Sequence, residues 1–318
     1  MKSRIVTITA TAAIALMGSA GAGAQDATPM ASPVGESLFA DLGLPELTIT
    51  VTDEGAEIDQ SEVEAGRYLV TLNNETAEPE VFAGFVQLPD DRTIDDLSYA
   101  DEVAAGTPIP QEMPPVEDFA WLYDTYLAGG PSSLTDASRQ VVVDLPAGNY
   151  GVWDEDPTSP RIAAALTVTG DPAARVEGPE PEAAVTIIEE GEGGVGFSFR
   201  ADGEFTTGPQ IVKVLNASDQ PHFMEAAQYP EAMTVDQVMA SFMFDPSSGA
   251  TPSPDMLDFE QITRAGWAGT QSPGATQWVV MDLEAGQVLV DCFIPDPLAD
   301  FTPHAFEGMI QLFDVAES

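Results

Sequence analysis

The chain's single cysteine and one of its two histidines lie in one stretch near its end. Residues 292–309 contain Cys292 and His304, with Met309 five residues further on. The other histidine, His222, lies upstream in the sequence Leu-Asn-Ala-Ser-Asp-Gln-Pro-His-Phe. A thiolate, two imidazoles and a thioether form the ligand set of a copper site that exchanges single electrons. In such sites the Cys and the two His form a plane, and the Met is a distant axial ligand.

The order of these residues resembles that of the cupredoxin family. In that family an early His follows an Asn-containing strand end, and Cys, His and Met come late, in one loop between the last two strands. The segment His304-Ala-Phe-Glu-Gly-Met309 is similar to the His-x-x-x-Gly-Met ending of type 1 copper sites, including those of copper nitrite reductases. The resemblance implies one type 1 copper and single-electron transfer. Eleven residues separate Cys292 from His304, more than in the small plastocyanin-like members, so the loop is expected to fold back further.

Each residue type of this set suits copper for its own reason. Cys292 as a thiolate stabilises Cu(I), the two imidazoles accept both oxidation states, and Met309 tunes the reduction potential. Because the thiol must be ionised and the imidazoles neutral, binding is expected to weaken in acid. Asn216 is either a hydrogen-bond partner that fixes the loop around the cysteine or a turn residue at a strand end.

The N-terminus predicts export. The basic start Met-Lys-Ser-Arg, the apolar residues 5–17 and the small residues Ala22-Gly23-Ala24 form the pattern of a signal peptide cleaved after Ala24. No later stretch reaches the about 18 to 20 apolar residues that cross a membrane, so we expect a secreted or extracytoplasmic protein without membrane insertion. In an oxidising compartment a lone Cys292 reacts unless it is buried or bound to metal. It could also simply be a small buried hydrophobe.

The composition is strongly acidic. The sequence has 10 Lys plus Arg against 53 Asp plus Glu, a formal net charge of −43. This charge argues against nucleic acid and anionic membranes as partners. It suits either docking of a cationic partner or solubility and adaptation to salt. The acidic residues are spread along the whole chain, so the charge identifies no partner.

Short stretches of alternating and β-branched residues predict an all-β chain. They lie at 47–52, 68–72, 139–145 and 162–168, and Gly, Pro, Asn and Asp separate them. This pattern is typical of an antiparallel β-sandwich or barrel. Together with the cupredoxin resemblance, it predicts tandem Greek-key β-sandwiches.

The chain also repeats itself. The sequences around Asn74 and Asn216 match, as do those that begin at Thr93 and Thr234 and those that surround Asp144 and Asp282. The offsets are 142, 141 and 138 residues, so they are nearly constant, and this indicates two domains of one fold. The predicted units are a signal peptide (1–24), a flexible N-terminus (25–44), a cupredoxin-like domain without metal ligands (45–170), a linker (171–182) and a cupredoxin-like domain with the copper site (183–318).

The first copy serves as an internal control for the metal site. Glu80 stands where the second copy has His222, Asp154 where it has Cys292, and Arg161 where it has His304. The fold alone therefore does not require the ligands. A hard-cation site at Glu80 and Asp154 is conceivable, but Arg161 would repel a cation, so we expect the first copy to be metal-free.

The loop around His304 is apolar. If His304 lies near the surface, as the late His does in cupredoxins, this loop would offer a patch where a redox partner docks. The alternative is that Phe301 and Phe306 cover the core. The apolar residues in question are Ile294, Pro297, Leu298, Phe301, Pro303 and Phe306.

Three hypotheses about function follow. The first is an exported protein that binds one type 1 copper and transfers single electrons. The second is a copper storage or delivery protein without a redox cycle, and the third is a metal-free pair of β-sandwich interaction modules. Because both histidines are already assigned, none remains for a catalytic copper centre, and the sequence predicts that the chain is not an enzyme. The sequence leaves the oligomeric state open.

Overall fold

The computed structural model describes residues 37–97, 116–155, 163–244, 251, 253, 256–258 and 261–318. The predicted signal peptide and Arg161 lie outside these residues. Among the described residues, strands predominate, and α3 (Val235–Phe242) is the only α-helix. The all-β prediction is confirmed. No helix in this part of the chain is long and apolar enough to cross a membrane.

The first half of the chain contributes strands to three sheets. The alternation of buried and exposed residues in β1 shows why these segments are strands: Leu47, Ile49 and Val51 face the core, while their neighbours face outward. The elements of this half are η1 (Ala40–Leu42), β1 (Glu46–Thr52), β2 (Gly55–Ile58), β3 (Glu62–Glu64), β4 (Gly66–Asn74), β5 (Glu80–Phe82), β6 (Gly84–Gln87), η2 (Ile94–Leu97), η3 (Val116–Asp124), β7 (Ser132–Leu134), β8 (Ser138–Leu145), β9 (Gly148–Trp153) and β10 (Ala163–Thr169).

The second half repeats this succession and adds, between β18 and β21, a segment that carries His304. Its elements are β11 (Val185–Glu192), β12 (Gly196–Gly203), β13 (Phe205–Thr206), β14 (Gly208–Asn216), β15 (His222–Gln228), α3, β16 (Thr263–Gln271), β17 (Thr276–Leu283), β18 (Gly286–Asp291), β19 (Pro295–Asp296), β20 (Thr302–Pro303), η6 (His304–Glu307) and β21 (Ile310–Ala316).

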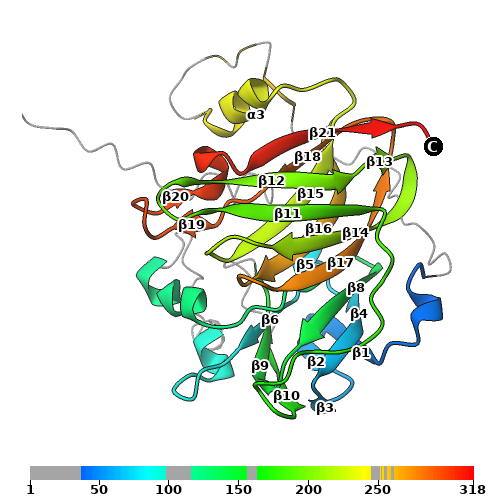
Figure 1. The fold of residues 1–318 in the computed structure, drawn as a ribbon, viewed down its shortest axis with the longest axis vertical. Coiled ribbons are helices and arrows are strands. Elements are labelled where there is room, and N and C mark those ends of the chain that lie inside the picture. Colours follow the sequence, from blue (N-terminus) through cyan, green and yellow to red (C-terminus); the bar gives the residue numbers. More distant parts are fainter. Residues whose placement is uncertain are drawn as a thin grey trace, which may run out of the picture.

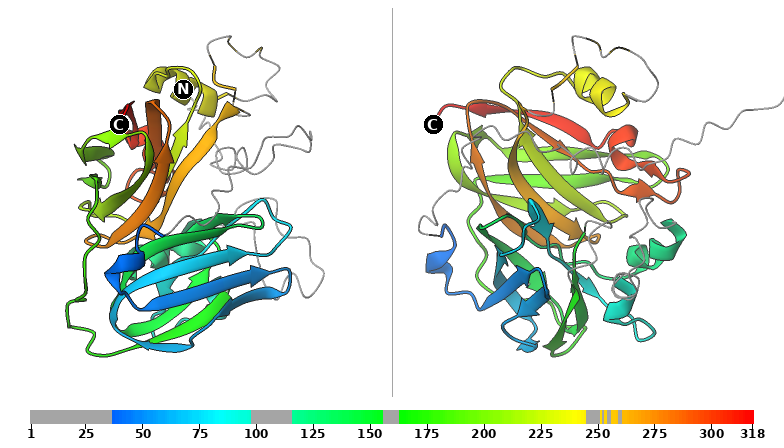
Figure 2. Two further views of the ribbon diagram at one scale, coloured as in Figure 1. Left: turned by 90° about the vertical axis from the view of Figure 1, so that its right-hand side faces the viewer. Right: turned by 180° about the vertical axis from the view of Figure 1, so that it is seen from behind.

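One sheet runs through both halves. Its strand order is β12-β11-β14-β17-β8-β4-β1-β2, so the matching strands β17 and β8 meet at its middle (Figure 1). They pair antiparallel, with Trp278 opposite Val142. Each half closes its sandwich with a sheet of its own, β3-β10-β9-β6 in the first and β13-β21-β18-β15-β16 in the second. Figure 2 shows the strands of the two halves in separate groups, one above the other. The exact domain bounds stay a prediction.

The repeat extends to individual hydrogen bonds. Nδ2 of Asn74 donates to the carbonyls of Glu78 and Ser133, and its Oδ1 accepts from Thr76. In the second half, Nδ2 of Asn216 donates to the carbonyls of Gln220 and Gln271, and its Oδ1 accepts from Ser218. Each Asn therefore ties the turn after its strand to a neighbouring segment, which explains why the sequence around it is kept in both copies.

The start of the described chain is packed against the shared sheet. Phe39 and Leu44 are buried in a cluster with Leu69, Val142 and Trp278. The segment 25–44 was expected to be flexible; its part from residue 37 onward instead covers this face, because Phe39 fills the space beside the Trp278 ring.

The two halves also contact each other beside the β8–β17 pair. The amide of Gly269 donates to the carbonyl of Gly130, and a Cβ on Gly269 would come within 2.6 Å of the backbone nitrogen of Gly130. Only glycine permits this approach. Nearby, Arg264 of β16 forms ion pairs with Glu80 of β5 and, at 2.7 Å, with Glu225 of β15.

Candidate metal centre

Two neighbouring strands bring the first two predicted ligands together. His222 begins β15, and Cys292 directly follows β18, which pairs antiparallel with β15. Asp291, the last residue of β18, stands opposite Glu225, so the sulfur comes close to the start of β15. The pairing of these strands therefore brings together two residues that are 70 positions apart.

The segment after Cys292 folds back to bring His304 to the same place. The short hairpin β19–β20 reverses the chain, and the amide of His304 donates to the carbonyl of Ile294 at 2.9 Å. The amide of Cys292 donates to the carbonyl of Met309 at 3.2 Å, and the amide of Met309 donates to the carbonyl of His304 at 2.9 Å. The hairpin thus accommodates the long Cys-to-His spacing that the sequence showed.

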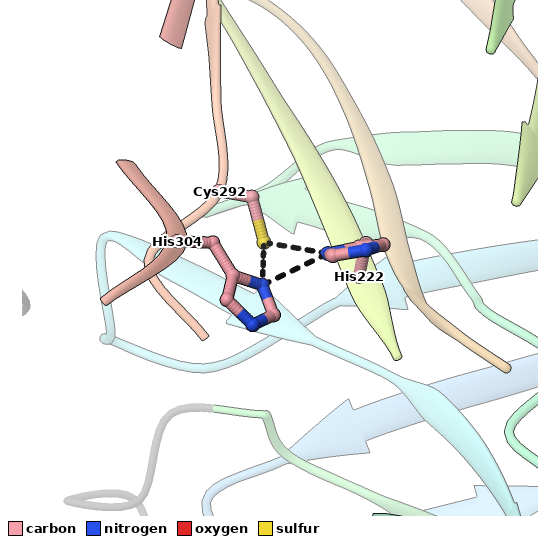
Figure 3. Close-up of side chains that lie close together, drawn as sticks. All are labelled: His222, Cys292 and His304. Atoms are coloured by element: carbon pink, nitrogen blue, oxygen red, sulfur yellow. Dashed lines mark hydrogen bonds between the residues drawn. The ribbon is translucent and has the colours of Figure 1, made fainter. Parts of the chain in front are cut away.

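The three side chains point toward one another (Figure 3). Sγ of Cys292 lies 3.7 Å from Nδ1 of His222 and 3.8 Å from Nδ1 of His304. The two Nδ1 atoms are 2.9 Å apart. All three residues have no exposed surface. Three of the four predicted ligands therefore converge through the atoms that bind metals.

The two sulfur–nitrogen separations fit a metal ion. Bonds of about 2.3 Å to sulfur and about 2.0 Å to nitrogen, at about 120° around a metal, place the sulfur and nitrogen about 3.7 Å apart. The observed sulfur–nitrogen separations agree with this value. Two bare nitrogen lone pairs 2.9 Å apart would repel each other, so either a proton or a cation lies between them. A thiolate with two imidazoles is the donor set that copper prefers.

Burial sets the protonation states of the ligands. It lowers the pKa of His222 well below its usual value, and the nearby His304 lowers it further. Burial also lowers the pKa of His304 to about 4, although Asp296 opposes this. Both imidazoles are therefore neutral at neutral pH, as metal binding requires. The pKa of the Cys292 thiol is raised well above its usual value, mainly by burial, while backbone hydrogen bonds from Ile294 and Phe223 counteract part of that rise.

Copper affinity is expected to fall by about tenfold for each pH unit between about pH 8 and pH 5, because one thiol proton must leave when the metal binds. Below the His304 pKa of about 4 the fall should steepen, because a second proton then competes with the metal. Titrations against a competing chelator at several pH values measure the slope. An affinity that does not change over this range would show that Cys292 is not a ligand.

Met309, the fourth predicted ligand, is fully buried in the same core cluster as Cys292. The backbone of Met309 forms hydrogen bonds with the backbones of both Cys292 and His304, which hold this residue beside the site. Its role as an axial ligand stays a prediction. Phe197 also contributes to the site, because its ring lies against the imidazoles of His222 and His304, at centroid distances of 4.8 and 4.2 Å.

His304 does not lie near the surface. The sequence left open whether this imidazole lies close to solvent; in the structure it has no exposed surface, and the Phe197 ring and the Gln220 side chain lie against it. Leu298 and Phe301 of the same loop are 70% and 37% exposed, whereas Phe306 packs against the core cluster around Phe293. The loop therefore carries exposed apolar side chains, while the ligand itself is buried.

The side chain of Asn216 holds the turn before His222 rather than the cysteine loop, so the turn-residue hypothesis is the one that agrees with its contacts. Sequence reasoning did not find Gln220, whose Oε1 accepts a hydrogen bond from Nε2 of His304 at 3.1 Å. No spacing rule could indicate this contact, because the two residues are 84 positions apart. It likewise missed Tyr123, whose hydroxyl donates to the carbonyl of Pro295 in the metal-binding loop.

In the first half, the counterparts of the ligands have other roles. Glu80 is bound by the Arg264 guanidinium, so a hard cation would have to displace that ion pair. Asp154 is buried after β9, and Arg161 lies outside the described residues. Within the part of the chain that the structure describes, the His222, Cys292 and His304 group is the one cluster of such side chains that could hold a metal.

Comparisons with known proteins give likenesses only at the level of structure. No family model matches the chain, and no curated protein matches it. Among similar solved structures is an auracyanin from Roseiflexus castenholzii, which is 17% identical over 42% of this chain and 99% of its own, with a TM-score of 0.25. A multicopper oxidase is 13% identical over 85% of this chain and 88% of its own, with a TM-score of 0.22.

A copper nitrite reductase from Nitrosomonas europaea is 11% identical over 85% of this chain and 93% of its own, with a TM-score of 0.22. Oxidases and nitrite reductases are enzymes, so the sequence-based prediction that this chain is not an enzyme conflicts with these likenesses and is withdrawn. The resemblance seen in the sequence is confirmed: the fold is all-β and of the Greek-key type, and the triad of His222, Cys292 and His304 fits a cupredoxin copper site.

Proposed function

We propose that the chain binds one type 1 copper ion in its second half and transfers single electrons. Cys292, His222 and His304 would hold the ion, with Met309 as the axial ligand. The observation that carries the proposal is the convergence of Sγ and two Nδ1 atoms, with sulfur–nitrogen separations that suit a trigonal metal site. When bound, copper would supply the one-electron redox chemistry.

The protein contributes a rigid and dry environment to this chemistry. The strand pair β15–β18 fixes His222 and Cys292, while the backbone bonds of Ile294 and Met309 fix the return of the chain to His304. Because the ligands are already close together and fully buried, they need little movement when the charge of the ion changes. The apolar surroundings, including Phe197, exclude water and influence the reduction potential.

We also infer that the protein is exported and that a redox partner docks near His304. The leader-like sequence of residues 1–24 supports export. The exposed side chains of Leu298 and Phe301, on the loop that leads to His304, support docking there. A partner that contacts this loop would lie against the segment that leads to His304.

The test is to add Cu(II) to the purified protein in substoichiometric steps and then to reduce and reoxidise it. We expect one copper per chain and the intense visible absorption of a Cu(II)–thiolate bond. The absorption should vanish on reduction and return on reoxidation. Copper bound without this absorption would favour storage or delivery of the metal, and the absence of binding would favour metal-free interaction modules; either result would contradict the proposal.

A further inference from the structure

A buried amide links the ligand His304 to a carboxylate. Oε1 of Gln220 lies 3.1 Å from Nε2 of His304, on the side of the ring away from Cys292. Nε2 of Gln220 donates to Oδ1 of Asp296 at 2.8 Å. His304 and Asp296 have no exposed surface, and Gln220 is 5% exposed. The three side chains form a continuous chain of hydrogen bonds behind the metal-binding atoms.

The surroundings of Asp296 fix which way the amide points. Oδ2 of Asp296 accepts the amide hydrogen of Gly194 at 2.6 Å, and Oδ1 accepts that of Leu298 at 2.6 Å. Such a carboxylate, ringed by N–H groups, acts as an acceptor only. The NH₂ group of Gln220 must therefore face Asp296, and its carbonyl oxygen must face the imidazole.

This orientation determines the tautomer of His304. A carbonyl oxygen at 3.1 Å requires a hydrogen on Nε2. In a neutral imidazole the other nitrogen, Nδ1, then has a free lone pair. This is the nitrogen that faces Cys292 and His222.

The backbone of Gln220 is fixed as well. Its carbonyl accepts hydrogen bonds from Nδ2 of Asn216 at 2.8 Å and from Oγ of Ser218 at 3.0 Å, and its amide donates to Oγ of Ser218. The Asn216 turn, which recurs in the first half around Asn74, therefore serves an added purpose here. It places Gln220 against the ligand, and the side chain cannot turn away without losing buried hydrogen bonds.

We propose that Gln220, braced by Asp296, is a positioning residue of the metal site: it holds the proton of His304 on Nε2, presents Nδ1 to the metal and favours Cu(II) over Cu(I). The last effect arises because an imidazole that donates to an acceptor backed by a carboxylate is a stronger electron donor. Nε2 of His222 has no hydrogen-bond partner among the described residues, so no such constraint acts on the second imidazole there. The effect on copper rests on the proposed function, whereas the effect on the tautomer does not.

The experiment uses the full chain and compares wild type with Gln220→Met, which keeps the length of the side chain and removes its acceptor. Gln210→Met is the control, because Gln210 is also buried and its NH₂ group also donates a hydrogen bond, in this case to the carbonyl of Thr206, at the end of β14 far from the Asn216 turn. In the metal-free proteins, ¹⁵N NMR of the imidazoles reports the tautomer. In the loaded proteins, chelator competition and redox titration report the copper affinity and the reduction potential.

We expect wild-type His304 to carry its proton on Nε2 and Gln220→Met to populate both tautomers. Cu(II) affinity should fall by about 10- to 100-fold in Gln220→Met, and its reduction potential should rise, while Gln210→Met should match wild type in all three measurements. Asp296→Asn keeps the shape of the side chain but cannot accept hydrogen bonds from all three N–H groups, those of Gly194, Gln220 and Leu298. Like Gln220→Met, it should lower the copper affinity and raise the reduction potential.

Two results would overturn the proposal. One is a proton on Nδ1 of His304 in the metal-free wild-type protein. The other is a Gln220→Met protein that folds, as judged by its circular dichroism, and has the affinity and potential of the Gln210→Met control. If wild type binds no copper but shows the Nε2 tautomer that is lost in Gln220→Met, the proposed function fails while the positioning role of Gln220 stands.

Discussion

A Cys292→Ser variant is expected to bind Cu(II) more than about 100-fold more weakly than wild type, because loss of a direct ligand exceeds the cost of losing an outer partner of one. Serine occupies the same space, but its hydroxyl does not ionise at neutral pH and gives no soft donor to Cu(I). The two imidazoles, with Met309 as the distant axial ligand, would then hold the ion. Competition with a chelator of known affinity measures the loss.

The first control is the Cys292→Ser protein measured without copper. Replacing sulfur by oxygen hardly changes the shape of the side chain, so this variant should keep most of the fold. Met281→Leu is the matched variant: it removes another fully buried sulfur of the same core cluster, on β17, and should leave copper binding unchanged. If Cys292→Ser kept the wild-type affinity and absorption, the thiol would have no part in the site.

The Trp278→Ala variant should lower the free energy of unfolding by about 3–5 kcal/mol, the usual cost of removing a buried aromatic side chain. Trp278 is 1% exposed and lies on β17 where that strand meets β8, so its ring fills the junction of the two halves. It packs in a cluster with Phe39, and the guanidinium of Arg67 lies 4.4 Å from the ring centroid. Urea unfolding, followed by circular dichroism, measures the change.

Trp121→Ala makes the same substitution at a half-buried position of η3, where Arg92 lies over the ring at 5.3 Å. Less apolar surface is removed from the interior there, so the loss should be smaller. Equal losses in the two variants would mean that the β8–β17 junction contributes no more to stability than the outer edge of the first half.

The sequence was sufficient to predict the features that depend on residue type and local pattern. Alternating β-branched residues predicted the strands, and the scarcity of Cys and His made the ligands of the site stand out. The repeated Asn turn predicted that two similar units follow each other, and both turns have the same hydrogen bonds in the structure. These features are local, so they can be recognised without knowing how the chain packs.

What the sequence could not predict depends on contacts between distant segments. A repeat does not show that β8 and β17 pair and join the two copies in one sheet. This pairing depends on contacts between the copies, whereas the repeat reflects only the sequence within each copy. The sequence also could not show the ion pair between Arg264 and Glu80, because these two residues are 184 positions apart. The sequence left the burial of His304 open for the same reason: the side chains that lie against it, Phe197 and Gln220, come from other parts of the chain.

The central claim is that Cys292, His222 and His304 bind the same copper ion. X-ray absorption spectroscopy at the copper edge, on protein loaded with one equivalent of Cu(II), tests this most directly because it identifies the atoms bonded to the metal. The structure predicts one sulfur at the short distance of a thiolate bond together with two imidazole nitrogens. A spectrum with only nitrogen and oxygen neighbours would contradict the claim, because the ion would then lie outside the buried triad.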